Sequence, residues 1–289
     1  LLILESTTYP GTTDEELVPV VENQGFQIGD DFFIGYSPER EDPGNLKYSI
    51  IRGNLSKVVS GYTDSCETLV KELYGTVIKN VHPVSNIRTA EFTKLLENIY
   101  RSVNVGLVNE LYKICLKMNI NIYEAINAAS TKPFGYKAFF PGPGVGGHCI
   151  PIDPWFIQQV DEQNSRLINT ARLINDEMPG KIVCKIKTAT QNINEPRIVA
   201  IGASYKANTA DIRESPSIEI VRILRSEGYK VEHFDPLVDG MHFPTTMTNA
   251  CANADCLVIL VEHKSILREL DQHEQDILSA LNTPLILRF

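Results

Sequence analysis

The chain has 289 residues, which is enough for about two domains with hydrophobic cores. Hydrophobic residues make up 43% and charged residues 22%, as in a globular protein, and the formal net charge of -9 argues against binding nucleic acid or an anionic membrane through bulk electrostatics. No run approaches the roughly 20 apolar residues of a membrane span, and the 6 cysteines form neither a CxxC pair nor a zinc-like cluster with histidine. We therefore expect a cytoplasmic protein in a reducing setting, without a metal.

The first part of the chain alternates short strands with helices. Its predicted strands are 1–5, 32–36, 57–60 and 76–81, the last closed by Pro83, and its predicted helices are 12–23 and 64–74. Thr12 or Thr13 is expected to cap the first helix. The alternation predicts part of a parallel α/β sheet. Because the chain opens directly on an apolar strand without an initiator Met, we expect residues upstream to be missing.

The middle of the chain is helical, and a second α/β unit follows it. The predicted helices are 86–118, 121–130 and 154–191, the last with a break near 178–180, and a loop rich in glycine and proline fills 131–153. The first of these is far longer than the usual helix of about 11 or 12 residues, which is typical of a domain connection or a dimer interface. In the second unit the predicted strands are 198–202, 230–234 and 256–261, and the predicted helix is 217–227.

The loop before Cys149 has an unusual composition. Four glycines and two prolines stand in the run 140–147, and glycines allow close approach to a ligand. Asp153 and Pro154 are expected as N-cap and first residue of the next helix, which places Cys149 just before a helix N-terminus, where the dipole stabilises a thiolate. The loop thus favours either a nucleophilic thiolate with a nearby carboxylate, or a glycine turn with a core cysteine and a capping Asp.

Two other polar patterns are open to two interpretations each. Glu91, Lys94, Asn98 and Arg101 share one face of the long helix, where Lys and Asn can hold an oxyanion in a cleft, or where all four form a solvated stripe. The segment 204–217 follows a strand and places cations where a doubly wound fold binds ligands, or forms an ordinary polar loop. Ser215 and Pro216 are expected as N-cap and first residue of the helix that follows. The runs 6–13 and 37–40 follow two other strands, and a turn with a helix cap explains most of each.

Taken together and in order, these runs resemble the UDP-glucose/GDP-mannose dehydrogenase family along the whole chain. They read STTYPGTT, SPER, EFTKLLENIYRSVNVGLVNEL, GPGVGGHCIPIDP and SYKANTADIRESPS, of which GGHCIPIDP and K-x-N-x-x-D-x-R-E-S-P-S are the specific parts. The resemblance implies an α/β protein with a remnant of the NAD-binding Rossmann domain at 1–83, a central helical dimerisation domain at 84–192 and a UDP-sugar-binding Rossmann-like domain at 193–289. It also implies a homodimer formed through the helix at 86–118.

The resemblance further implies a four-electron oxidation of a sugar C6 alcohol to a carboxylate, with reduction of two NAD. Cys149 would form a thiohemiacetal and then a thioester, with Lys94 and Asn98 stabilising the oxyanion and Asp153 serving as or assisting the general base. The resemblance implies that Thr7 and Glu39 position a water and that Thr7 also contacts NAD. Phe140, Gly146 and Gly147 would contact the sugar and phosphates. Lys206 would contact the substrate, and Arg213 the cofactor.

The substrate and the completeness of the site are further expectations. The run TKPFG…FFPGPGVGGHCIPIDP is more similar to the UDP-N-acetylhexosamine branch than to the UDP-glucose branch, so UDP-N-acetylglucosamine is favoured, with its epimers next and UDP-glucose as the alternative. The family's NAD fingerprint lies well upstream of STTYP. We therefore expect the NAD domain to be largely absent and this chain to be inactive by itself, or to act as a UDP-sugar-binding dimer without activity.

Overall fold

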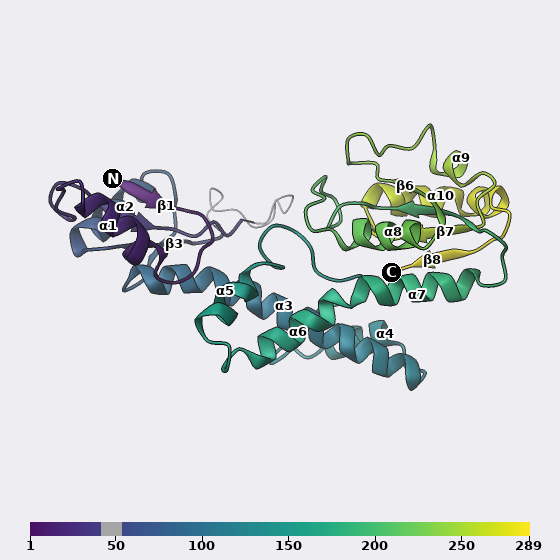
Figure 1. The fold of residues 1–289 in the computed structure, drawn as a ribbon, viewed down its shortest axis with the longest axis horizontal. Helices are drawn as coiled ribbons and strands as arrows, with labels where there is room; N and C mark the ends of the chain where they lie inside the picture. Colours follow the sequence, from purple (N-terminus) through teal and green to yellow (C-terminus); the bar gives the residue numbers. More distant parts are fainter. Residues whose placement is uncertain (42–53) are drawn as a thin grey trace. The chain divides into compact units, whose positions relative to one another are not determined.

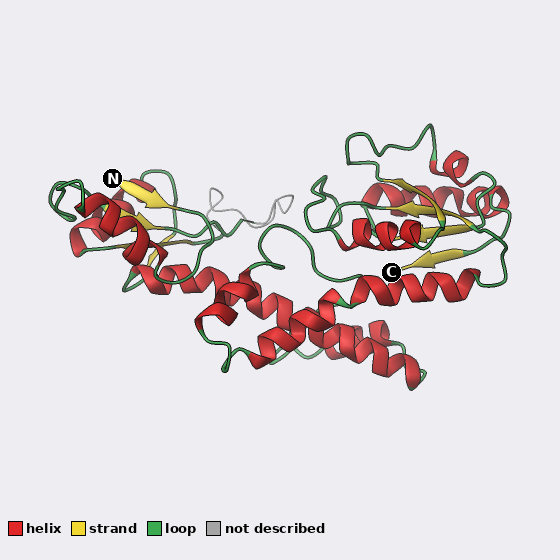
Figure 2. Ribbon diagram, viewed as in Figure 1, coloured by secondary structure: helices red, strands yellow, loops and turns green. Residues whose placement is uncertain are grey.

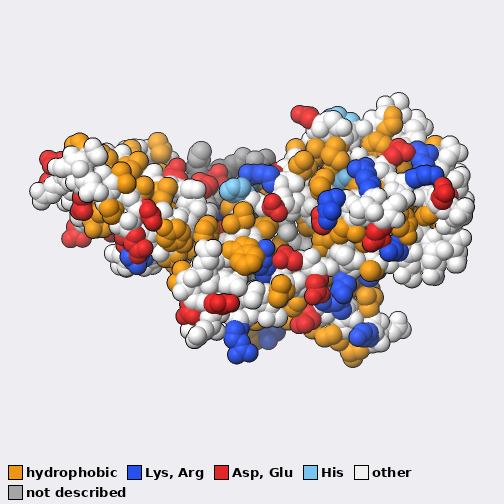
Figure 3. Space-filling view, in the orientation of Figure 1, with side chains coloured by type: hydrophobic (Ala, Val, Ile, Leu, Met, Phe, Trp, Pro, Cys, Tyr) orange, Lys and Arg blue, Asp and Glu red, His pale blue; other side chains and the backbone are white. Residues whose placement is uncertain are grey.

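A computed structural model describes residues 1–41 and 54–289 (Figure 1). The chain forms two compact units, one made of Leu1–Arg101 and Ile152–Arg166, and the other of Ser102–Pro151 and Leu167–Phe289. The long helix α3 (Ile87–Lys117) was predicted within a residue of its ends. Within the described residues, no helix is both long enough and apolar enough to span a bilayer. On the face drawn in Figure 3, basic and acidic side chains are interspersed.

The first unit contains a four-stranded mixed sheet. Its strands lie in the order β1 (Leu2–Leu4), β2 (Ile34–Tyr36), β3 (Lys57–Gly61) and β4 (Val81–Pro83), and β2 and β3 are antiparallel. The expected all-parallel sheet is therefore wrong at this pair. The expected strand at 76–81 is also displaced, because the backbone N–H groups of Val77 and Ile78 bond to Tyr74 and continue the end of helix α2 (Asp64–Gly75).

The helix after β1 begins in an unexpected way. Residues Thr12–Leu17 form a π-helical turn, η1, that continues into α1 (Val18–Glu22), and neither Thr12 nor Thr13 caps it. Instead, the buried Glu91 carboxylate of α3 accepts hydrogen bonds from Gly11 N at 2.6 Å, Thr13 N at 3.0 Å and Thr13 Oγ1 at 2.7 Å. The predicted cap is wrong because a carboxylate on another helix satisfies these donors.

The second unit contains a fully parallel sheet with helices on both faces (Figure 2). The strand order is β6 (Lys230–Phe234), β5 (Arg197–Ile201), β7 (Cys256–Ile259) and β8 (Ile286–Arg288). Successive residues of β7 enter opposite cores, as the pleat of a strand requires: Val258 packs with α7 (Met178–Thr190) and α8 (Pro216–Ser226), and Leu257 with α9 (Met247–Cys251) and α10 (Lys264–Ala280). Both faces are covered, which is typical of a doubly wound fold.

Three shorter helices precede and follow the glycine loop in the sequence. They are α4 (Ile122–Ala129), α5 (Asp153–Val160) and α6 (Arg166–Asp176). The single helical stretch expected over 154–191 is thus broken at 161–165 as well as near 178. The Asp161 side chain accepts hydrogen bonds from Asn164 N and Nδ2, which forms a turn there in place of a further helical turn.

The edge where β5 and β6 end is organised by one buried carboxylate, Asp235. Its oxygens accept from Ala203 N at 2.6 Å, Ser204 N at 3.1 Å, Leu237 N at 2.8 Å and His263 Nε2 at 3.0 Å. Burial by itself would raise the pKa of Asp235, but the hydrogen bonds from His263, Ala203 and Leu237 outweigh burial and lower this pKa to about 2.

Replacing Asp235 with Asn should therefore destabilise the second unit in a pH-dependent way. A carboxyl whose pKa falls from 3.8 to about 2 on folding adds about 2 kcal/mol to the free energy of unfolding above pH 3.8. This contribution is lost as the pH falls toward 2. Denaturant unfolding between pH 2.5 and 7 should show the gap between parent and variant closing at acid pH. The exposed Asp271→Asn variant on α10 is the control, and an Asp235→Asn gap that does not change with pH would contradict this account.

Candidate functional site

Cys149 lies on the loop between α4 and α5 and is half-buried. Its Sγ is 3.8 Å from Nδ1 of the exposed His148. Two other cysteines show the contrasting environment, since Cys251 and Cys256 are fully buried and burial raises the pKa of each thiol to about 12. The interpretation of Cys149 as a core cysteine is therefore wrong, and its loop position is that of a cysteine open to a reactant.

Asp153 and Asn98 form a buried pair in the first unit. Asn98 Nδ2 donates to Asp153 Oδ2 at 2.5 Å, and the two residues are 6% and 1% exposed. The expected N-cap role of Asp153 is wrong, because Ile152 occupies the N-cap without a side-chain bond and Asp153 is the first helical residue. Its carboxylate faces α3 instead, which brings together two of the predicted catalytic residues.

The face of α3 that carries Asn98 is not the solvated stripe that was one of its two interpretations. Glu91 and Asn98 are buried, Lys94 between them is half-buried, and only Arg101 at the end of the series is exposed. Lys94 lies about one helical turn before Asn98, so both side chains leave the helix on the same side. The arrangement suits a cation and an amide that act on the same group.

The loops after β1 and β2 lie at one edge of the first sheet, because these two strands are parallel. Thr7 is half-buried in the first loop, and Glu39 in the second is exposed. Lys57 is 3% exposed, and its ammonium lies 3.3 Å from Glu39 Oε2 and 3.0 Å from Glu5 Oε1. Sequence reasoning missed Lys57, since nothing in its apolar strand indicated a buried cation that holds the Glu39 side chain.

In the second unit the glycine loop packs directly on the segment 204–217. Gly147 N donates to Arg213 O at 3.0 Å, and Gly147 has φ +95°. A Cβ on Gly147 would lie 2.9 Å from the Tyr205 ring, and one on Gly146 would lie 2.5 Å from Glu214 O. The two glycines are therefore required by contact between the two family-specific segments. Their contact with a ligand stays a prediction.

The remaining predicted ligand contacts have defined surroundings in the second unit. Lys206 is half-buried. Arg213 is exposed and its Nη2 lies 2.6 Å from Asp211 Oδ2, a contact that lowers the pKa of Asp211. Phe140 is 49% exposed and stacks on Tyr123 with 6.5 Å between ring centroids. Ser215 caps α8 with Pro216 as its first residue, as predicted. These residues and Cys149 belong to one unit, whereas Thr7, Glu39, Lys94, Asn98 and Asp153 belong to the other.

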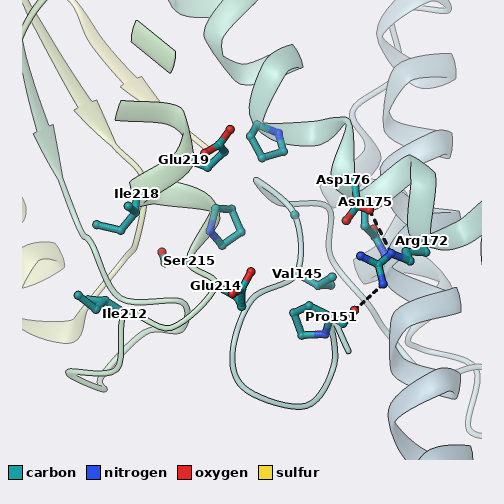
Figure 4. A pocket seen from close by; sticks show the side chains of 13 residues that line it. Val145, Pro151, Arg172, Asn175, Asp176, Ile212, Glu214, Ser215, Ile218 and Glu219 are labelled. Carbon is teal, nitrogen blue, oxygen red and sulfur yellow. Dashed lines mark hydrogen bonds and ion pairs between the residues drawn. The ribbon is translucent and has the colours of Figure 1, made fainter. Parts of the chain in front are cut away.

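A cavity of about 360 Å³ opens beside the glycine loop within the second unit (Figure 4). Gly144, Val145 and Pro151 line it, together with residues of α6 and the start of α8. Arg172 donates to Pro151 O at 2.7 Å and lies 3.2 Å from Asp176. Because its charged lining consists of Arg172 with the three acids Asp176, Glu214 and Glu219, this cavity does not favour a diphosphate.

Gly142, Gly144 and Gly147 match the letters of a G-x-G-x-x-G run. The dinucleotide fingerprint lies between a strand and a helix, because its glycines form the tight turn from strand to helix. Here the run follows α4 and its loop, so the preceding element is a helix. The glycine loop is therefore not a phosphate cradle of that kind.

Comparison with known protein families matches this chain in three consecutive stretches. The models of the UDP-glucose/GDP-mannose dehydrogenase family match residues 1–78 with the NAD binding domain, 88–177 with the central domain and 199–287 with the UDP binding domain. A UDP-N-acetyl-D-mannosamine dehydrogenase of Escherichia coli is 35% identical over 97% of this chain and 72% of its own length. The chain belongs to the UDP-glucose/GDP-mannose dehydrogenase family.

Other members of this family agree in sequence and in fold. A UDP-N-acetyl-D-mannosamine dehydrogenase of Methanococcus maripaludis is 36% identical over 91% of this chain. The structure of a UDP-D-ManNAc dehydrogenase from Pyrococcus horikoshii superposes with a TM-score of 0.90 at 33% identity, covering 100% of this chain and 68% of that one. The chain spans 60% to 65% of the length of three archaeal relatives that it matches.

The family match confirms the predicted α/β class and corrects one expectation. The NAD-binding domain was expected to be largely absent, but the model for this domain matches residues 1–78. This stretch carries the strands β1, β2 and β3 of the mixed sheet and the loops with Thr7 and Glu39. The chain thus contains matched regions of all three family domains.

Proposed function

We propose that the full-length protein is an NAD-dependent nucleotide-sugar 6-dehydrogenase that oxidises the C6 alcohol of a UDP-N-acetylhexosamine to the uronic acid. The strongest support is the half-buried Cys149 on a glycine loop, four residues before a carboxylate that a buried Asn98 holds at 2.5 Å. A cytoplasmic location is part of this proposal, because all 6 cysteines are free thiols.

The proposed chemistry uses these side chains in sequence. NAD, when bound, accepts a hydride in each of the two oxidations. The C6 alcohol loses its proton to Asp153 or to a water held by Thr7 and Glu39. The Cys149 thiolate then adds to the aldehyde carbon and forms a thiohemiacetal, whose oxidation leaves a thioester. Water attacks the thioester carbon, and the acid and the thiolate are released.

The oxyanions of this sequence need fixed donors. Lys94 supplies an ammonium, and the Asn98 amide nitrogen carries two N–H groups, so its bond to Asp153 leaves the second N–H for the substrate. The same bond fixes the amide before the substrate arrives. Fixed donors of this kind stabilise a developing charge without reorganising, which is where most of their effect on rate arises.

NAD is proposed to bind the first unit at the loop that follows β1. The hydroxyl of Thr7 follows β1 at the edge where parallel α/β sheets bind ligands. The N–H groups of Gly11 and Thr13 at the next helix start already donate to Glu91, so this helix start does not offer them to a phosphate. Arg213 would reach the cofactor as a cation only by sharing or leaving its contact with Asp211.

The relatives direct the choice of epimer. Several matched proteins are named UDP-N-acetyl-D-mannosamine dehydrogenase, whereas the sequence alone favoured UDP-N-acetylglucosamine. We therefore place UDP-N-acetylmannosamine first and the gluco and galacto epimers next. NADH formation by the full-length protein should be fastest with an N-acetylated hexose, and at least about tenfold slower with UDP-glucose. Faster turnover of UDP-glucose, or no NADH with any of the four sugars, would overturn the assignment.

A second function concerns the chain as it stands. Its second unit has a hydrophobic core on each face of the sheet, and Gly147 and Arg213 join the glycine loop to the segment 204–217. We therefore propose that this unit binds a UDP-sugar without turnover. Calorimetric titration should show heat with UDP-sugar and little with NAD. Binding of neither ligand would leave only a structural role for this chain.

We also propose that the protein is a homodimer through α3. Large apolar side chains recur three, four or seven residues apart along this helix, on one face, and are 38% to 55% exposed: Phe92, Leu96, Tyr100, Leu107, Leu111 and Ile114. A contiguous apolar stripe of this kind on a helix needs a partner, and a second copy offers the same stripe.

Placing two charges on the stripe should therefore break the dimer. We expect the parent chain to sediment at twice its monomer mass of 32.3 kDa and the Leu107→Glu/Leu111→Glu variant to sediment as a monomer. Leu73→Glu on α2 is the control, since Leu73 is 50% exposed and lies outside the stripe. A parent chain that sediments as a monomer would contradict the dimer.

A further inference from the structure

A buried polar cluster in the second unit has no role in the chemistry described above. His263, Asp235 and Ser204 are each 0% exposed. His263 precedes α10, Asp235 follows β6, and Ser204 opens the segment that carries Lys206. Burying polar side chains costs folding free energy unless their polar atoms have hydrogen-bond partners, so the contacts of this cluster need an explanation.

The contacts of His263 determine its tautomer. Asn208 N, which can only donate, lies 2.8 Å from His263 Nδ1, so Nδ1 is the acceptor and the ring proton is on Nε2. Nε2 then donates to Asp235 Oδ2 at 3.0 Å. His263 thus links the fixed carboxylate at the end of β6 to the backbone of the loop at Asn208.

Asn208 makes the second connection of this loop. Its backbone is left-handed, with φ +63°, and its side-chain Oδ1 accepts from Lys264 N at 2.9 Å. Lys264 is the first residue of α10, whose N-cap residue provides no side-chain bond. Asn208 therefore caps α10 from a different segment of the chain, and the loop is held at one residue by two hydrogen bonds.

The cluster contains the residue types of a hydrolytic triad but not its geometry. A triad needs Ser at one ring nitrogen and Asp at the other. Here Ser204 Oγ, at 3.3 Å, and Asp235 both lie at Nε2, and Ser204 Oγ donates to Lys206 O at 2.8 Å. With no exposed atom on any of the three residues, the cluster organises backbone and does not attack a substrate.

We propose that His263 and Asn208 are positioning residues that fix the loop 204–214 for binding of the UDP part of the substrate. This inference rests on the proposed function, because Lys206 is the expected UDP-sugar contact. Lys206 is two residues before Asn208. Farther along the same loop, the carbonyl oxygen of Arg213 accepts a hydrogen bond from Gly147 N, so this loop also supports the glycine loop. If the hydrogen bonds of Asn208 are lost, both Lys206 and Arg213 on the loop 204–214 can move.

Two matched substitutions of His263 separate positioning from general stability. His263→Asn keeps an acceptor near the place of Nδ1, and His263→Gln keeps a donor near the place of Nε2. Each keeps one of the two bonds and removes ring atoms from a buried site, so both lower the melting temperature. Only His263→Gln loses the bond to Asn208.

Two quantities are measured on the 289-residue chain: deuterium uptake of the peptide 204–214, and the affinity for UDP by calorimetry. In His263→Gln, uptake should rise and UDP should bind about tenfold more weakly, whereas His263→Asn should stay within about twofold of the parent in both. A second, exposed pair avoids disturbing the core. Asn208→Gly keeps the left-handed backbone but loses the α10 cap, so its UDP affinity should fall several-fold. Asn208→Asp keeps the cap and should retain the affinity.

Unchanged uptake in both His263→Gln and Asn208→Gly would overturn the positioning role. Raised uptake with unchanged UDP affinity would overturn its connection to substrate binding. If the parent chain binds no UDP while uptake still responds to His263→Gln, the proposed UDP-sugar binding by this chain fails and the positioning of the loop stands.

Discussion

Replacing Cys149 with Ser should lower uronate formation by the full-length protein by about a thousandfold or more. Serine cannot supply a thiolate, so neither the thiohemiacetal nor the thioester forms and the second oxidation loses its covalent route. The measurement is the uronate recovered at saturating UDP-sugar, because the first hydride transfer precedes the step of Cys149 and still forms NADH. Substrate affinity should change little, because the substitution replaces one atom on a loop whose glycines and Phe140 are unchanged.

The control for Cys149→Ser is Cys184→Ser. Cys184 is another free cysteine of the second unit, and it is exposed on α7. Its replacement should leave turnover unchanged, which excludes a general effect of removing a thiol. If Cys149→Ser retains turnover within tenfold of the parent, Cys149 is not the nucleophile.

Replacing Asn98 with Leu should have the second largest effect, on both stability and rate. The buried Asp153 carboxylate loses its 2.5 Å donor, which costs about 3 kcal/mol of unfolding free energy. Turnover should also fall by about a hundredfold, because an oxyanion donor is removed. Denaturant unfolding and steady-state kinetics measure the two effects separately.

The matched control is the double variant Asn98→Leu/Asp153→Leu. Removing both residues leaves no buried carboxylate that lacks its Asn98 donor, so the double variant should unfold with a smaller loss of free energy than Asn98→Leu alone. It should still lack activity. If the loss of unfolding free energy in the double variant equals the sum of the losses in Asn98→Leu and Asp153→Leu, the 2.5 Å contact does not couple the two residues.

Much of the fold could be predicted because the signals are local. The apolar period of α3 and the capping pair Ser215–Pro216 each indicated their element. The antiparallel pairing of β2 and β3 could not be predicted, because an apolar run carries no information on strand direction. The displaced strand β4 was missed because the end of α2 extends into the run that precedes it.

The sequence proposed residues for the candidate site but did not reveal their partners. Family-specific runs identified Cys149, Lys94 and Asp153, but Asp153 was expected to cap its own helix. It pairs instead with Asn98, a residue 55 positions away in sequence. Glu91, which caps the helix start at Gly11 across 80 residues, was missed for the same reason, and so was the contact between Asn208 and His263.

The stoichiometry of the reaction tests the central claim most directly. Full-length protein should be given a limiting amount of UDP-N-acetylmannosamine and excess NAD, and the NADH formed should be compared with the uronate recovered. An oxidation from alcohol to acid through a Cys149 thioester predicts two NADH for each sugar consumed, with no free aldehyde accumulating. One NADH for each sugar, with aldehyde as the product, would contradict it.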